Sequence, residues 1–166
     1  MDPHNLPFTA LIVGPTNSGK TQLLVNQLCG PFCCKFDYVV LTCPTFAYNK
    51  TLYRFAERDP RLYVIICEQQ HVEAWLKLVS MFFEGTNTLI ILIDYAASKD
   101  VKGRTGELVN LGFSARHAGL SVWVLTQQLS SITKPFRGNV AALVLFYTSS
   151  ANTMEMILKE YAAELS

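Results

Sequence analysis

The residue types with the clearest potential for chemistry lie in the segment GPTNSGKT at positions 14–21. Gly14, Gly19, Lys20 and Thr21 have the spacing G-x-x-x-x-G-K-[ST] of a phosphate-binding loop. In such a loop, backbone N–H groups approach phosphate oxygens and the start of the next helix adds partial positive charge. The lysine reaches the β- and γ-phosphates, and the threonine hydroxyl ligates Mg²⁺. The pattern therefore predicts that this segment binds ATP with Mg²⁺.

The segments on either side have the character that such a loop requires. Residues 8–13 form a short apolar run of strand length, and residues 21–28 carry apolar side chains at helical spacing. A strand, a glycine-containing loop and a helix in this order form an anion cradle. The residues expected to contact the nucleotide are Gly14, Pro15, Thr16, Asn17, Ser18, Gly19, Lys20, Thr21 and Gln22.

Two further polar residues stand where apolar runs end. Asp94 ends the run 88–94, and Gln127 follows the run 121–126. Ligands of parallel α/β sheets bind at the carboxyl edge, so we expect both side chains there. An acid in this place is the usual Mg²⁺ partner of a phosphate-binding loop, and a glutamine can hold the attacking water or sense the γ-phosphate. Alternatively, Asp94 caps a helix and Gln127 is an ordinary polar residue at a strand end.

The pattern of elements along the chain predicts how these residues are positioned. Strands are expected at 8–13, 38–42, 63–67, 88–94, 121–126 and 141–147, and most are apolar without alternation. Such runs are typical of parallel strands buried on both faces. Helical patterns lie between them, most clearly at 69–83 and 152–164. This alternation predicts an α/β fold, a three-layer sandwich with a mainly parallel central sheet, as one domain over residues 1–166.

The composition limits the other possibilities. Of 166 residues, 50% are hydrophobic and 16% are charged, with a net charge of +1, so no global basic field indicates a nucleic-acid partner. The apolar runs have strand length, and the N-terminus lacks a basic stretch followed by an apolar one. We therefore expect no membrane partner and an intracellular location. The five cysteines lack the spacing of a zinc site and are expected to be reduced thiols.

Basic residues follow the strand ends. The loop 97–104 contains Arg104, and the loop 130–137 contains Arg137. Arg116 stands near the end of a helical segment, where it could cap carbonyl groups or reach a neighbouring subunit's nucleotide site. Each of these side chains could also be an ordinary solvated charge.

Three segments together resemble a known family. GPTNSGKT, TLIILIDYAASKD and SARHAGLSVWVLTQQLSSITKPFR are similar to the poxvirus-type genome-packaging ATPases of the FtsK–HerA group. Members occur in large DNA viruses and in Maverick/Polinton or adintovirus-like elements. The resemblance covers about residues 7–163, and the stretch around Thr126-Gln127-Gln128 is more specific than the phosphate-binding loop.

The resemblance implies a P-loop NTPase with a RecA-like core of the additional-strand class, in which the strand 121–126 lies between the strands 8–13 and 88–94. It implies a hexameric ring that moves double-stranded DNA into a capsid or through a portal in a virus-infected cell. Lys20, Thr21 and Gln127 would have the family's phosphate, Mg²⁺ and sensor roles. Arg116, Arg104 and Arg137 are candidates for an arginine finger that acts on a neighbouring subunit.

The sequence departs from the family pattern at one place. The family's strand usually ends in two adjacent acids, whereas this chain has Ile93-Asp94-Tyr95. If the pair corresponds to Ile93 and Asp94, the Mg²⁺-binding acid is missing; if it corresponds to Asp94 and Tyr95, the base is missing. The Ala-Ala-Ser-Lys-Asp that follows favours the first register. Asp94 must then fill both roles, or Asp100 or Glu68 substitutes.

Three functions remain open from the sequence. The first is an ATP-driven DNA translocase subunit, with Lys20, Asp94, Gln127 and Arg116 as candidate catalytic residues and Thr21 and Asp94 as metal ligands. The second is a nucleotide-binding relic or regulatory homologue with impaired hydrolysis, which the single acid favours. The third is a small-molecule kinase, which the lack of a C-x-x-C pair and of an arginine-rich lid disfavours.

Overall fold

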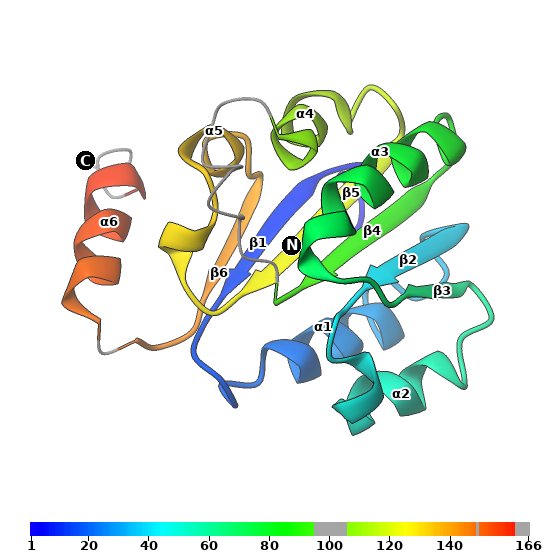
Figure 1. Cartoon of the computed structure of the whole chain (residues 1–166), viewed down its shortest axis with the longest axis horizontal. Helices are drawn as coiled ribbons and strands as arrows, with labels where there is room; N and C mark the ends of the chain where they lie inside the picture. The colour runs from blue at the N-terminus through cyan, green and yellow to red at the C-terminus, as the bar shows by residue number, and fades with distance from the viewer. Residues whose placement is uncertain (95–105, 149, 162–166) are drawn as a thin grey trace.

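A six-stranded parallel sheet forms the centre of the computed structural model, which describes residues 1–94, 106–148 and 150–161 (Figure 1). The strands are β1 (Thr9–Val13), β2 (Tyr38–Thr42), β3 (Leu62–Ile65), β4 (Thr88–Ile93), β5 (Leu120–Thr126) and β6 (Ala142–Leu145). Their order is β3-β2-β4-β5-β1-β6, and every neighbouring pair is parallel. The predicted additional strand is confirmed, because β5 lies between β1 and β4.

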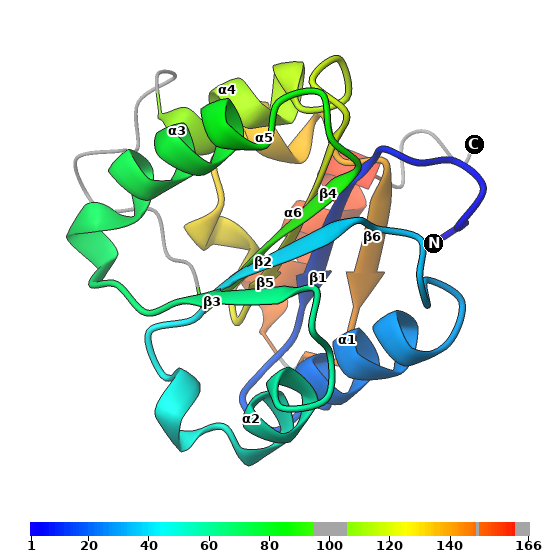
Figure 2. The same cartoon turned by 90° about the vertical axis from the view of Figure 1, so that its right-hand side faces the viewer.

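Helices cover both faces of this sheet. They are α1 (Lys20–Cys29), α2 (Lys50–Ala56), α3 (Val72–Phe82), α4 (Glu107–Ser114), α5 (Lys134–Arg137) and α6 (Ala151–Tyr161), with short 3₁₀ turns at Phe46–Tyr48, Gln69–His71 and Leu129–Ser131. Figure 2 shows α1 and α2 on one face and α3, α4 and α5 on the other. The three-layer α/β sandwich predicted from the sequence is therefore the observed fold.

The strands carry apolar side chains to two separate cores. Along β1, Ala10 and Ile12 belong to the core beneath α1 and α2, whereas Leu11 and Val13 belong to the core beneath α3 and α4. All residues of β1, β4 and β5 are buried. This burial explains why the sequence shows continuous apolar runs instead of an alternating pattern.

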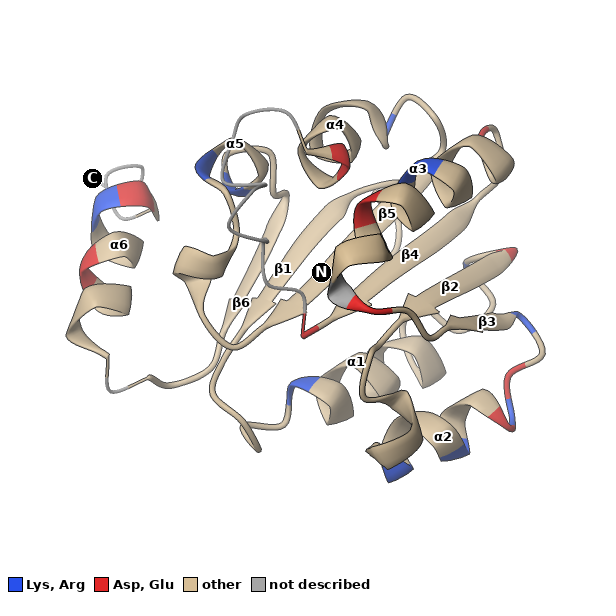
Figure 3. Ribbon diagram, in the orientation of Figure 1, with Lys and Arg blue, Asp and Glu red and all other residues tan. Residues whose placement is uncertain are grey.

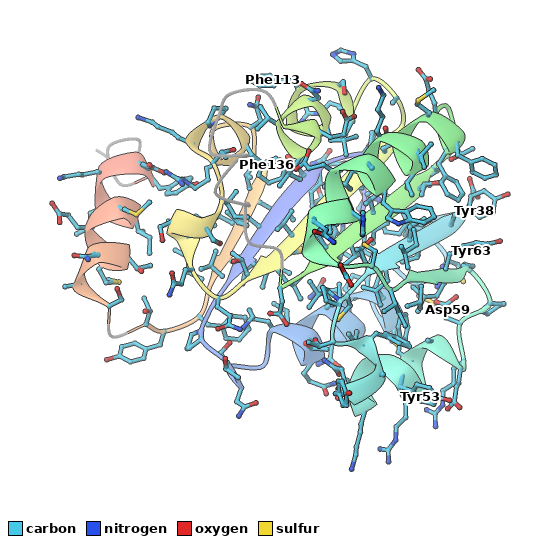
Figure 4. The ribbon with its side chains drawn as sticks, viewed as in Figure 1. Tyr38, Tyr53, Asp59, Tyr63, Phe113 and Phe136 are labelled. Atoms are coloured by element: carbon cyan, nitrogen blue, oxygen red, sulfur yellow. The ribbon has the colours of Figure 1, made fainter. Side chains whose placement is uncertain are left out.

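Two side chains illustrate the contrast between the core and the sheet edge (Figure 4). Phe136 is fully buried and packs closely against Gly112 of α4. Tyr63, on the edge strand β3, is 51% exposed, and its ring lies 6.1 Å from that of Tyr38. In the described part of the chain, no helix is long and apolar enough to cross a membrane.

The predicted boundaries differ from the observed ones mainly at the sheet edges. β3 begins one residue before the predicted strand and ends at Ile65, and β6 covers only four residues of the predicted 141–147. Both strands pair on one side only, which leaves their ends without a second ladder of hydrogen bonds. The helix predicted at 152–164 is described from Ala151 to Tyr161, and residues 162–164 lie outside the described residues.

Candidate nucleotide-binding site

The loop between β1 and α1 has the backbone form of an anion cradle. Asn17 and Gly19 adopt left-handed conformations with φ of 60° and 97°, and α1 begins at the next residue, Lys20. The N–H of Ser18 donates to the carbonyl of Pro15 at 3.2 Å, which closes the turn. Left-handed residues that alternate with helical ones form the concave backbone nests that bind phosphates. The local backbone thus fits the role predicted for this loop.

Gly14 is required here because another segment packs against it. A Cβ atom at this position would lie 2.6 Å from Cβ of Phe146 and 2.7 Å from Oγ of Ser18. Phe146 follows β6, and its N–H donates to the carbonyl of Val13 at 2.8 Å. No pattern in the sequence points to Phe146, because the contact joins segments more than a hundred residues apart.

Lys20 is buried at the start of α1. Its ammonium donates to the carbonyls of Gly14 at 2.7 Å and Pro15 at 2.8 Å. An ammonium group has three N–H donors, so one remains for a phosphate oxygen. Burial lowers the pKa of Lys20, and the nearby Asp94 carboxylate partly opposes this shift. Lys20 and Asp94 therefore lie within electrostatic range of one another, as the motif predicts.

Backbone hydrogen bonds bring three strand ends together at the carboxyl edge of the sheet. The N–H of Gly14 donates to the carbonyl of Thr126 at 3.1 Å, and the N–H of Asp94 donates to the carbonyl of Leu125 at 3.0 Å. Gln127, the next residue after β5, therefore lies between the phosphate-binding loop and Asp94, and its side chain is exposed. The structure places Lys20, Asp94 and Gln127 at one site, and their chemical roles stay predictions.

The residue before Asp94 belongs to the hydrophobic core. Ile93 is 4% exposed and packs in the cluster beneath α1 and α2. Asp94 itself is exposed and has a left-handed backbone with φ of 55°. Tyr95 and Asp100 lie outside the described residues, as does Arg104.

Glu68 lies between β3 and the 3₁₀ turn that precedes α3. It follows β3, which is separated from β1 by β2, β4 and β5. Its carboxylate accepts a hydrogen bond from Gln70 at 2.6 Å. Only β2 separates β3 from β4, the strand that Asp94 follows, so the substitution of Glu68 for the missing acid stays a prediction.

A cavity of about 570 Å³ opens at the start of α1. Its lining comes from the phosphate-binding loop and from the connection between β2 and α2. The residues are Asn17, Ser18, Gly19, Lys20, Thr21, Gln22, Thr45, Tyr48, Asn49, Lys50 and Thr51. Six of the nine predicted contact residues line it, whereas Gly14, Pro15 and Thr16 do not. The second wall was missed, because it carries no recognised motif.

A Mg²⁺ site at this place has two predicted ligands. Thr21 lines the cavity, and Asp94 directly follows β4 at the carboxyl edge of the sheet. Within 1–94, 106–148 and 150–161, no group of three or more His, Cys, Asp and Glu side chains is arranged to hold a metal. A hydroxyl and one carboxylate fit the way in which Mg²⁺ binds with few protein ligands and the nucleotide phosphates.

Arg116 does not join the site of its own chain. It is exposed before β5 and lines a different cavity with the N-terminal residues, Phe8 and Ala142. This cavity lies at the amino ends of β1, β5 and β6, opposite to the phosphate-binding loop. Arg116 is thus remote from the phosphate-binding loop of its own chain, and its role toward a neighbouring subunit's nucleotide site stays a prediction.

Arg137 is a buried structural residue and not a free surface charge. Its guanidinium donates to Glu160 at 2.8 and 2.6 Å and to the carbonyls of Leu129 and Ile132. The hydrogen bonds from Arg137 hold the pKa of Glu160 below its ordinary value of 4.5. Arg137 therefore joins the loop after Gln127 to α6, which excludes it as an arginine finger in this conformation.

The fold and the motifs agree with the comparisons to known proteins. Residues 3–165 match the family described as Poxvirus A32 protein. The genome-packaging NTPase B204 of Sulfolobus turreted icosahedral virus 2, in complex with AMPPCP, is 18% identical, with a TM-score of 0.76 over 99% of this chain and 86% of that one. EssC (ATPases 2 and 3) from Geobacillus thermodenitrificans is 12% identical, with a TM-score of 0.66 over 90% of this chain and 34% of that one. A search of curated proteins gave no significant match. The match over nearly the whole length shows that the chain belongs to the Poxvirus A32 protein family.

Proposed function

We propose that the chain is an ATP-binding motor subunit that uses ATP hydrolysis to package double-stranded viral DNA. The observation that carries this proposal is the convergence of the phosphate-binding loop, Asp94 and Gln127 at one sheet edge. Membership of the Poxvirus A32 family supports it. B204, a packaging NTPase with the same fold, has been solved with AMPPCP and with ATP-gammaS.

Each residue at this edge has a role that its position supports. The backbone of residues 14–22 cradles the phosphates, and Lys20 donates to the β- and γ-phosphates. Thr21 and Asp94 hold Mg²⁺, which would neutralise charge on the phosphates. Gln127 orients the attacking water from the tip of β5. Positioning and electrostatic stabilisation provide most of the catalysis in such sites.

A second candidate function is nucleotide binding with impaired hydrolysis. The burial of Ile93 favours it, because an apolar side chain stands where the family usually has an acid. Asp94 is then the one described carboxylate near Lys20 and must bind Mg²⁺ and act as the base. The loss of one general base typically costs a factor of about 10²–10⁴ in rate.

The assembly that we propose is a ring, as a hexamer, of chains that each form one domain over residues 1–166. Several chains add their phosphate contacts on one DNA molecule, so a net charge of +1 per chain does not prevent binding. An arginine from one subunit would act on the next; Arg116 and Arg104 are the candidates. A capsid or portal would receive the DNA inside an infected cell.

Steady-state ATP hydrolysis with and without double-stranded DNA tests this proposal. The motor predicts turnover above that of a Lys20→Ala control and stimulation by DNA. Retained ATP binding with no turnover above the control would support the hydrolysis-impaired alternative. An absence of ATP binding would overturn both candidates.

A further inference from the structure

The connection between β2 and α2 forms a wall opposite the phosphate-binding loop. Tyr48, Asn49 and Lys50 stand on this wall, and Lys20 and Thr21 stand on the other side of the same cavity. Lys50 is exposed, and no described carboxylate lies within ion-pair distance of its ammonium. Figure 3 shows basic positions at the start of α1 and on α2. Lys50 is therefore a cation beside the phosphate site that has no partner within the described chain.

The wall faces the side of the site where the terminal phosphate would lie. Asp94 follows β4, which lies between β2 and β5 in the sheet, with β1 beyond β5. Asp94 thus lies between the phosphate-binding loop and the end of β2, and its carboxylate acts on both Lys20 and the Cys43 thiol. The wall begins two residues after Cys43, beyond Asp94. Because Lys20 and Thr21 serve the β- and γ-phosphates and Mg²⁺, the wall is on the terminal-phosphate side.

The backbone of this wall is held firmly. The side-chain oxygen of Asn49 accepts a hydrogen bond from the backbone N–H of Leu52 at 3.1 Å. The backbone N–H of Asn49 donates to the carbonyl of Phe46 at 3.0 Å. Leu52 and Phe55 are buried in the core that α1 also covers. Lys50 therefore has a fixed starting point and a flexible stem that can reach across the cavity.

The charge of the cavity favours a polyanion. Its lining contains Lys20 and Lys50 and no acidic residue, and Asp94 is the nearby carboxylate. A nucleoside triphosphate carries more negative charge at its end than a diphosphate. A second lysine on the terminal-phosphate side attracts the γ-phosphate of a triphosphate more strongly than it attracts a diphosphate, which lacks that group.

We propose that Lys50 binds the terminal phosphate of a nucleoside triphosphate from across the cavity, so that the site distinguishes a triphosphate from a diphosphate. This inference rests on the proposed binding of ATP. Lys50 partly replaces the electrostatic contribution of tightly held Mg²⁺, which the apolar Ile93 does not help to bind. The contribution of Lys50 to the affinity for a triphosphate is accordingly larger without Mg²⁺ than with it.

The test is calorimetric binding of AMPPCP and ADP to the full chain, with Mg²⁺ and with EDTA. The variants are Lys50→Ala, Lys50→Arg and, as a matched control, Arg54→Ala, which changes an exposed base one turn along the same helix, outside this cavity. Lys50→Ala should weaken AMPPCP about tenfold in EDTA, equivalent to about 1.4 kcal/mol, and ADP by about twofold or less. Lys50→Arg should restore most of the difference, and Arg54→Ala should bind as the wild type.

The outcomes separate this inference from the proposed function. If the wild type binds both nucleotides and Lys50→Ala binds them with the same affinities, the proposed role of Lys50 is overturned and the proposed ATP binding is not. An equal loss for AMPPCP and ADP would also overturn it, because the terminal phosphate would not be what Lys50 recognises. If the wild type binds neither nucleotide, the proposed function fails as well. Thermal melts should be equal for all variants, since Lys50 and Arg54 are exposed.

Discussion

The phosphate-binding loop and the end of β4 lie at the same sheet edge but differ in completeness. The loop has every residue of its motif, a backbone nest and a buried lysine. The end of β4 has one exposed carboxylate, next to an isoleucine that belongs to the core. The contrast indicates that binding and cleavage of the nucleotide depend on different parts of the edge. Mutations at the two parts should therefore separate the two activities.

The largest separation is expected from Asp94→Asn. The substitution removes the one described carboxylate near Lys20 and should lower hydrolysis about 100-fold or more. The phosphate-binding loop is unchanged, so nucleotide affinity in EDTA should stay within about twofold of the wild type. Parallel turnover and calorimetric measurements check this. A comparable loss of affinity in EDTA would show that the two parts are not separable.

Ile93→Asp should restore the family's pair of acids and raise hydrolysis about tenfold, since a second carboxylate can hold Mg²⁺ while Asp94 acts as the base. The same change puts a carboxylate into the core and should cost about 2 kcal/mol of stability without Mg²⁺. Turnover and denaturation, each with and without Mg²⁺, are the measurements. Ile93→Asn, similar in size and uncharged, is the control. If Ile93→Asp gives no more turnover than this control, the acid pair does not correspond to Ile93 and Asp94.

Arg137→Ala should lower ATP turnover, because Arg137 anchors the loop that follows β5 and Gln127. It leaves the carbonyls of Leu129 and Ile132 and the carboxylate of Glu160 without their partner, at a cost of about 3 kcal/mol in the free energy of unfolding. The loop after Gln127 loses its anchor, so turnover should fall more than affinity in EDTA. Lys134→Ala, a basic residue in the same short helix, is the control. A variant as stable as the wild type would contradict the structural role of Arg137.

The smallest effect concerns the pH dependence of the same ion pair. Arg137 lowers the pKa of Glu160 in the folded chain, so the native state binds fewer protons than the unfolded state near pH 4. The stabilisation is full above about pH 4.5 and decreases as the pH falls through the lowered pKa. Glu160→Gln should lose this dependence, of order 1 kcal/mol, in urea titrations between pH 3 and 6. Identical profiles would exclude the pair as a source of acid sensitivity.

Local patterns made the fold and one side of the site predictable. The run from Leu89 to Ile93 is buried on both faces, so its apolar sequence could be read directly as a central strand. Asp94 and Gln127 were found at the edge because parallel strands end together. These inferences needed only neighbours in the sequence and a general rule for α/β sheets.

The missed features all depend on contacts between distant segments. Phe146 packs closely against Gly14, and Lys50 lines the same cavity as Lys20. Neither contact leaves a pattern in the sequence. Arg137 looked like a loop charge, because only the folded chain brings Glu160 to it.

A single-turnover experiment tests the central claim most directly, because one reaction reports binding and cleavage together. An excess of the chain is mixed with radiolabelled ATP and Mg²⁺, and bound and cleaved nucleotide are followed with and without double-stranded DNA. The account predicts rapid retention of ATP, slow cleavage, faster cleavage with DNA, and neither retention nor cleavage for Lys20→Ala. Failure to retain ATP, or equal retention by Lys20→Ala, would contradict it.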